Sequence, residues 1–139
     1  MSESTSITTT LIPEKERLTY IEKTFGMGFP LRIEPFIYSV ARHISEDYNG
    51  GYWHYHSLSN GCFWMHPESG EPFDVISDNG YTGSMQPEAF GITCCLYSYS
   101  NLSFYENKQL SDLCTQHYHL LRDFVPKLSQ AGQISAVCD

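Results

Sequence analysis

Two Asn-Gly pairs between short aromatic runs constrain the fold of this sequence more than any other feature. Asn60-Gly61 and Asn79-Gly80 each separate two runs that have the composition of strands. A loop with two prolines separates the two pairs of runs. The sequence therefore predicts an antiparallel meander of about four strands, at residues 52–58, 62–66, 73–77 and 81–85.

Helical periodicity flanks this middle segment on both sides. Apolar residues recur there at spacings of three and four residues, the period of one buried helix face. The helices are expected to begin at Pro13, near Pro35, after Pro87 and near Leu110. Helices followed by strands and again by helices indicate an α+β fold, with helices from both ends of the chain packed on the sheet.

The length of 139 residues suits one domain that buries its core without disulfides. The Ser/Thr-rich start predicts a loose N-terminal arm at residues 1–10, a single domain follows at residues 11–139, and Gly132 precedes a short tail. The five cysteines are odd in number and form no CxxC pair, so we expect reduced thiols. Because no signal peptide or membrane span is recognisable, we expect a cytoplasmic protein.

The charge of the chain is unevenly distributed. Eight Lys and Arg residues stand against sixteen Asp and Glu residues, which leaves a net charge of −8. No Lys or Arg occurs between His43 and Asn107, so this segment carries the whole net charge. A chain of this kind repels phosphate groups, and we expect no direct binding to nucleic acid or to an anionic membrane.

The acidic segment has three interpretations. It could be a solvated surface that keeps the protein soluble. It could be a docking face for a basic partner, with candidate residues Glu46, Asp47, Asp74, Asp78 and the C-terminal Asp139. It could also imitate DNA, but a mimic needs dense carboxylates at regular spacing, and apolar strands interrupt the acids here.

The densest group of potential ligands lies in the first predicted hairpin and consists of His54, His56, Cys62 and His66. Strand periodicity places His54 and His56 on one face. A two-residue loop at Asn60-Gly61 would send His66 to the opposite face. A three-residue loop that includes Ser59, with Gly61 in the left-handed region, would pair His54 with His66 beside His56.

Three imidazoles could hold Zn²⁺ with an open position, and Cys62 near His66 could form a thiol–imidazole pair. Such a cluster would make the protein a metal-dependent or thiol enzyme. However, no carboxylate stands at HExxH spacing and no basic cluster would lower the pKa of the thiol. The alternative is that these histidines pack within an aromatic strand. His117, in the apolar stripe of the last helix, is expected to be a hydrogen-bonded core residue.

The longest recognisable motif also lies in this hairpin. It runs Tyr48-Asn49-Gly50-Gly51-Tyr52-Trp53-His54-Tyr55 and continues as Leu58-Ser59-Asn60-Gly61-Cys62-Phe63-Trp64-Met65. The motif resembles the antirestriction family typified by ArdB and KlcA, whose pattern is roughly YxGGYWxFYxLSNGGFYMxP. The segments 7–13, 79–85 and 117–124 also resemble that family. Cys62 and Trp64 depart from the pattern, and His56 and His66 do not belong to it.

The resemblance implies an accessory protein of plasmids and other mobile elements that relieves restriction by type I restriction–modification enzymes. It implies a protein without catalytic residues, cofactor or metal that binds the restriction complex or an associated host factor. It also implies a mechanism distinct from that of the acidic ArdA proteins, which imitate DNA. We expect a monomer or a weak homodimer, with motif residues that are mainly structural: Gly50, Gly51, Tyr52, Trp53, His54, Asn60 and Gly61.

Overall fold

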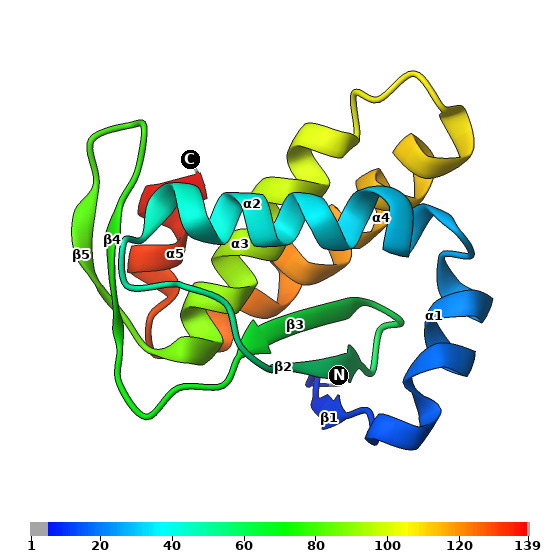
Figure 1. Cartoon of the computed structure of the whole chain (residues 1–139), viewed down its shortest axis with the longest axis horizontal. Coiled ribbons are helices and arrows are strands. Elements are labelled where there is room, and N and C mark those ends of the chain that lie inside the picture. Colours follow the sequence, from blue (N-terminus) through cyan, green and yellow to red (C-terminus); the bar gives the residue numbers. More distant parts are fainter. Residues whose placement is uncertain (1–5, 139) are drawn as a thin grey trace.

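A computed structural model of the chain describes residues 6–138. Its elements are β1 (Thr9–Leu11), η1 (Glu14–Glu16), α1 (Arg17–Thr24), η2 (Phe29–Ile33), α2 (Glu34–Ile44), β2 (Trp53–Leu58), β3 (Phe63–Pro67), β4 (Phe73–Ile76), β5 (Thr82–Met85), α3 (Pro87–Leu102), α4 (Lys108–Phe124), η3 (Val125–Lys127) and α5 (Ala131–Cys138) (Figure 1). Helices from both ends of the chain pack against antiparallel strands, which confirms the predicted α+β class. Within the described residues, no helix is long and apolar enough to cross a membrane.

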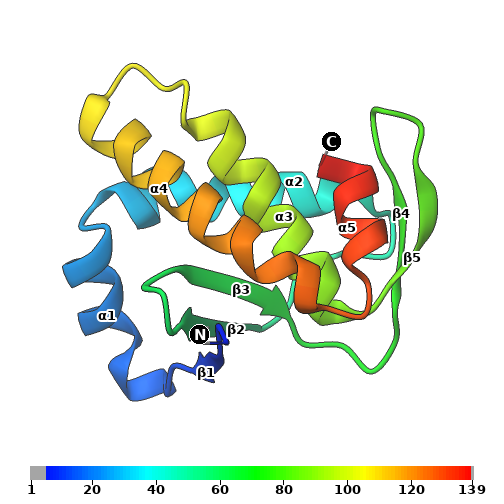
Figure 2. The ribbon, with the colours of Figure 1, turned by 180° about the vertical axis from the view of Figure 1, so that it is seen from behind.

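Helix α3 runs through the middle of the molecule, with α4 on one side of it and α2 on the other (Figure 2). It contacts β3, α2, α4 and α5, and its side chains are buried on nearly every side, including Phe90, Ile92 and Tyr99. The sequence predicted only one apolar face for this segment. A helix whose small and apolar residues surround it on all sides is stable only when it is enclosed, and the fold encloses α3.

The first hairpin has the register of the three-residue loop. His54 pairs with His66 and Ser57 pairs with Phe63, while Leu58 and Cys62 close the turn through a hydrogen bond of 2.8 Å from the Leu58 N–H to the Cys62 carbonyl oxygen. Gly61 has a φ of 95°, a conformation that side-chain-bearing residues rarely adopt. Of the two loop lengths that the sequence left open, the structure therefore selects the longer.

The strands form two sheets rather than one meander. Strands β1, β2 and β3 make a three-stranded sheet, and β4 and β5 make a separate hairpin beside α5 (Figure 1). The prediction of one continuous meander of four strands is thus wrong, although each of the four strands exists and pairs antiparallel with its neighbour in its own hairpin.

The outer edge of β3 explains why β4 does not pair with it. Here side chains from two helices bond the backbone groups that a further strand would use. The Phe63 N–H donates to Nδ1 of His117 (3.1 Å), and the Phe63 carbonyl accepts from the Tyr99 hydroxyl (2.7 Å). The Met65 carbonyl accepts from the Cys95 thiol (3.6 Å). Because these three groups already have partners, they are not free to pair with β4. The expectation that His117 is a hydrogen-bonded core residue is confirmed.

The structure also differs from the sequence prediction near both ends of the chain. Thr9 and Thr10 belong to β1 and pair with Leu58 and Ser57, so the predicted loose arm is wrong for these residues; residues 1–5 lie outside the described part. The predicted short tail after Gly132 is helical in α5, whose Ile134 and Val137 side chains are buried. Both segments are ordered by contacts with distant parts of the chain, which local patterns do not reveal.

The side chain of Asn79, in the turn of the second hairpin, holds helix α5. Its amide nitrogen donates to the carbonyls of Ala136 (2.7 Å) and Val137 (3.2 Å), in the last turn of that helix. Its oxygen accepts from the backbone N–H of Tyr81 (3.3 Å). Because the last carbonyls of a helix lack partners within the helix, this side chain fixes the helix end to the hairpin.

Replacing Asn79 with alanine should therefore loosen α5. We expect a loss of about 1–2 kcal/mol in the free energy of unfolding, because the substitution removes hydrogen bonds to two helix carbonyls. We also expect faster hydrogen exchange confined to α5 and the second hairpin. The matched control is Asn101→Ala, whose amide bonds only the Tyr97 carbonyl within its own helix. Unchanged exchange in α5 of the Asn79→Ala protein would contradict this role.

Candidate functional site

Four of the five acidic residues predicted as a docking face lie around one hollow. This acidic groove has a volume of about 440 Å³ and is lined by His43, Ile44, Glu46, Asp47, Asp74, Ile76, Ser77 and Asp78. The end of α2 and the segment that follows it contribute one side, and β4 with its turn contributes the other. Asp139, the fifth residue, lies outside the described residues.

A hydrogen bond joins the two sides of the acidic groove. The Asp74 backbone N–H lies on the edge of β4 that does not face β5 and donates to Oδ2 of Asp47 (2.8 Å). On the rim, Nε2 of His43 lies 2.9 Å from Oδ1 of Asp78, which also accepts from the Tyr97 hydroxyl through Oδ2 (3.3 Å). Neither lysine nor arginine lines the groove, and Ile76 adds an apolar side chain that is 61% exposed. The surface therefore suits a partner with basic groups around an apolar contact.

The histidine cluster comes together on one face of the first hairpin. The ring centroids of His54 and His66 are 5.2 Å apart, and those of His56 and His66 are 4.9 Å apart. However, Nε2 of His54 bonds Oε1 of Glu68 (2.9 Å), and Nδ1 of His66 bonds the Pro67 carbonyl (3.0 Å). Over residues 6–138, no group of three or more His, Cys, Asp or Glu side chains is arranged to hold a metal ion.

Burial shifts the pKa values of two residues predicted for this cluster, His56 and Cys62. Burial, with smaller contributions from the neighbouring His66 and His54, lowers the pKa of His56 to about 4. The Cys62 side chain is fully buried, and its thiol donates to the carbonyls of Phe63 (3.3 Å) and His117 (3.5 Å). Burial also raises the pKa of the Cys62 thiol, which disfavours the thiolate that a nucleophile requires. The lowered pKa of His56 favours its neutral imidazole, and the raised pKa of Cys62 favours its protonated thiol.

The motif residues lie in turns and packing contacts around the first hairpin. Gly50 and Gly51 have φ values of 104° and 118°, which allow the chain to turn from α2 into β2. The Trp53 indole donates to the Tyr48 hydroxyl (3.0 Å) inside the core. The Arg17 guanidinium donates to the Tyr52 hydroxyl (2.7 Å), linking the motif to α1.

Asn60 connects the tip of the hairpin to α4. Its amide donates to the Leu120 carbonyl (2.9 Å), and its oxygen accepts from the Cys62 N–H (3.1 Å). Asn60 thus bridges hairpin and helix in the way that Asn79 does at the second hairpin.

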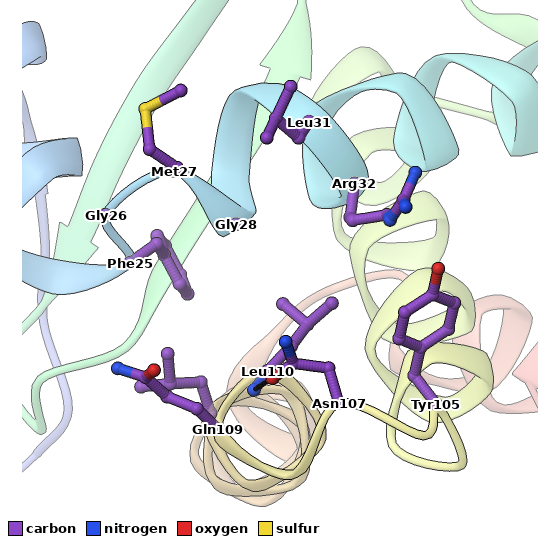
Figure 3. Close-up of a pocket in the computed structure, with 11 residues that line it drawn as sticks. Phe25, Gly26, Met27, Gly28, Leu31, Arg32, Tyr105, Asn107, Gln109 and Leu110 are labelled. Atoms are coloured by element: carbon purple, nitrogen blue, oxygen red, sulfur yellow. Dashed lines mark hydrogen bonds between the residues drawn. The ribbon is translucent and has the colours of Figure 1, made fainter.

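A further hollow of about 470 Å³ lies between η2 and the start of α4 (Figure 3). Figure 3 shows Arg32 and Tyr105 facing one another across it, and the guanidinium carbon lies 5.5 Å from the centre of the tyrosine ring. Met27 and Leu31 line its rim and are 68% and 59% exposed. Sequence reasoning missed this hollow, because Met27 and Leu31 fall between two predicted helices and follow no periodic pattern. The one available signal in the sequence was that both residues lie in an apolar segment for which no buried face was expected.

Comparison with known proteins gives consistent results. The profile of a family described as "Antirestriction protein" matches residues 46–139. The chain is 31% identical over 135 residues to antirestriction protein KlcA of Escherichia coli, covering 96% of this chain and 95% of that protein. It is 32% identical over 138 residues to the uncharacterized protein YafX of Escherichia coli strain K12, covering 96% and 88%.

A solved structure is also similar to this chain. The TM-score is 0.89 at 30% sequence identity, and the match covers 100% of this chain and 99% of the other. This structure belongs to the KlcA and ArdB proteins, which are described as having a novel fold and antirestriction activity against type I DNA restriction systems in vivo but not in vitro.

Proposed function

The chain belongs to the antirestriction protein family, and we propose that it relieves restriction by type I restriction–modification enzymes by binding rather than by catalysis. It acts in the cytoplasm for the benefit of a mobile element. Its partner is the restriction–modification complex or a host factor associated with that complex. The activity described for the similar KlcA and ArdB proteins, present in vivo and absent in vitro, supports a role for a cellular component that purified assays lack.

The observation that carries this proposal is the acidic groove. Glu46, Asp47, Asp74 and Asp78 surround one hollow, although they come from two separate segments of the chain. Proteins that bind DNA and move along it need basic surfaces, and such surfaces are complementary to a groove of this charge. Complementary charge raises the association rate more than the final affinity, so added salt should slow binding.

The same geometry favours binding to a protein over imitation of DNA. A mimic would present carboxylates along an extended line that matches the phosphates of a duplex. Here four carboxylates gather in one short groove, and one of them is engaged by His43. A mimic would also compete with DNA in a purified assay, whereas the similar KlcA and ArdB proteins showed no activity in vitro.

Reversing the charge of the acidic groove tests the proposal. In a host with a type I system, we expect wild-type protein to restore plating of unmodified phage without changing the modification of the progeny. The variant Glu46→Lys/Asp47→Lys/Asp74→Lys/Asp78→Lys should lose about tenfold or more of this relief, because like charges placed opposite one another cost several kcal/mol. Plating efficiency and progeny modification are the measurements.

Two further variants separate binding from folding. A triple variant that retains Asp47 keeps the hydrogen bond to Asp74 and should show the same loss. A control with the same change in net charge, Glu16→Lys/Glu22→Lys/Glu106→Lys/Asp123→Lys, alters exposed acids away from the groove and should retain most of the relief. Full relief by folded triple and quadruple variants would overturn the role of the groove. If cells that carry the wild-type protein lose both restriction and modification, this result would instead favour a mimic of DNA.

A further inference from the structure

A second hollow of similar size lies where the first sheet meets the start of α3. Its volume is about 440 Å³, and the residues that matter here are Thr9, His56, Trp64, His66, Glu88 and Gln130. It shares no lining residue with the acidic groove. We call it the ring pocket, because three ring side chains of the hairpin line one of its sides.

The rings of the ring pocket form one nearly parallel group. His56 and Trp64 pair directly across the two strands, with ring centroids 4.2 Å apart and an interplanar angle of 11°. Trp64 and His66 lie 5.5 Å apart at 29°. The Trp64 indole is held in place by a hydrogen bond to Oγ1 of Thr9 (3.0 Å). The three-residue turn, which places His66 on the same face as His56, creates this group.

The imidazoles supply hydrogen-bond acceptors to the pocket. The Pro67 carbonyl can only accept, so Nδ1 of His66 carries the proton and Nε2 carries the lone pair in the neutral ring. Both ring nitrogens of His56 are shielded from solvent and lack a hydrogen-bond partner. A donor that entered the pocket and turned the His56 ring slightly would supply a bond that the folded chain does not provide.

The charge of the ring pocket is negative. Glu88, in the first turn of α3, is its one residue with a formal charge at neutral pH, and no lysine or arginine lines the pocket. Burial lowers the pKa of His66, while Glu88 acts on that pKa in the opposite direction, as a carboxylate near the ring does. The Glu88 carboxylate would therefore repel an anionic ligand, whereas a cation with several donors would meet that carboxylate, lone-pair nitrogens and ring faces.

We propose that the ring pocket receives the guanidinium group of an arginine side chain presented by a protein partner. A guanidinium is planar, stacks on aromatic faces and carries five N–H donors, which fits a pocket made of rings and acceptors. An ammonium group is compact and more strongly hydrated, so lysine fits less well. This site is independent of the acidic groove, and its test does not depend on the antirestriction assay.

The test uses three capped amino acids and the full-length protein. N-acetyl-arginine amide, N-acetyl-lysine amide and N-acetyl-citrulline amide are titrated separately while NMR follows the indole N–H of Trp64 and the ring signals of His56 and His66. Citrulline has nearly the shape of arginine but no charge. We expect arginine to shift these signals and to bind at least about fivefold more tightly than lysine or citrulline, because only arginine combines charge with a planar donor set.

Matched variants locate the binding. Glu88→Gln should weaken arginine binding about tenfold, because it removes the counter-charge in the pocket. Glu22→Gln makes the same change in net charge at an exposed residue that lines neither the ring pocket nor the acidic groove, and it should change binding less than about twofold. Thermal unfolding shows whether each variant is folded.

Three results would overturn the proposal. One is the absence of any shift at Trp64. Another is equal binding of arginine and lysine, or equal weakening by the two variants, which would indicate unspecific attraction to an acidic protein. The third comes from a parallel titration with uncapped arginine: tighter binding of this form than of the capped form would identify a free amino acid rather than a protein segment as the ligand.

Discussion

Replacing Gly91 with alanine is expected to destabilise the protein by about 3 kcal/mol or more, or to prevent folding altogether. Gly91 lies in α3 where this helix crosses β3. A Cβ atom built there would overlap the Cβ and Cα of His66 and the carbonyl oxygen of Met65. Two of these three atoms belong to the strand backbone, so no side-chain rotation relieves the overlap, and α3 would have to move away from the sheet.

Two opposing effects determine how the Gly91→Ala substitution changes stability. Alanine gains about 1 kcal/mol over glycine in helix propensity, which would favour the variant if packing were unchanged. The overlap with the strand outweighs this gain, because α3 also holds the outer edge of β3 through Tyr99 and Cys95. Unfolding in urea, followed by circular dichroism, gives the free energy of unfolding.

Gly132→Ala is the matched control for Gly91→Ala. Gly132 also lies in a helix, α5, but a Cβ atom there would meet nothing within 4 Å. This substitution should be neutral or should stabilise the protein by about 0.5–1 kcal/mol. If Gly91→Ala were as stable as Gly132→Ala, α3 would not pack against β3 as closely as described.

The second large effect is expected at His117, whose ring is buried between α4 and the first sheet. Its Nδ1 accepts the N–H of Phe63, and burial lowers the pKa of His117 to about 4. Replacing His117 with leucine would leave that buried N–H without a partner, at a cost of about 1–3 kcal/mol. His117→Asn, whose side-chain oxygen can take the place of Nδ1, should lose less.

The same residue predicts how stability depends on pH. Above the ordinary pKa of 6.5 the ring is neutral in the folded and unfolded states, so it contributes no pH dependence. Between 6.5 and about 4 the unfolded chain binds a proton that the folded chain does not. The free energy of unfolding therefore decreases as the pH falls through this range, by an amount on the order of 3 kcal/mol for His117.

Unfolding measured at several pH values would check this expectation. His56, whose pKa is also lowered to about 4, acts in the same direction. His117→Asn removes one titrating group, so its stability should depend less steeply on pH than that of the wild-type protein. Identical slopes for the two proteins would show that the ring of His117 is not held neutral in the folded state.

Local patterns were sufficient to predict the four central strands and helices α1 to α4, but neither β1 nor α5. The hairpin turns at Asn60-Gly61 and Asn79-Gly80 follow from residues that tolerate tight turns, and periodicity located the helices. The length of the first turn was not determined, because both loop lengths satisfy the same local sequence. The three-residue turn places His66 beside His54 and His56 and creates the ring pocket.

The candidate sites were predictable only in part. The sequence identified an acidic middle segment, but residues 46–47 and 74–78 are joined into one groove by the packing of β4 beside the end of α2. The hollow at Arg32 and Tyr105 joins residues that are more than seventy positions apart, so no local pattern contains it. The place of Glu88 at the ring pocket likewise depends on how α3 lies on the first sheet.

By itself, the sequence determined the α+β class, the four central strands, most of the helices and the resemblance to antirestriction proteins. The tertiary structure alone decided that the strands form two sheets, that α3 is enclosed and that the last residues form a helix. The physical reason lies in the hydrogen bonds of β3. Its outer edge is completed by His117, Tyr99 and Cys95 instead of another strand. Such partners are set by the packing of distant segments, whereas turn preference and periodicity act between neighbours in the chain.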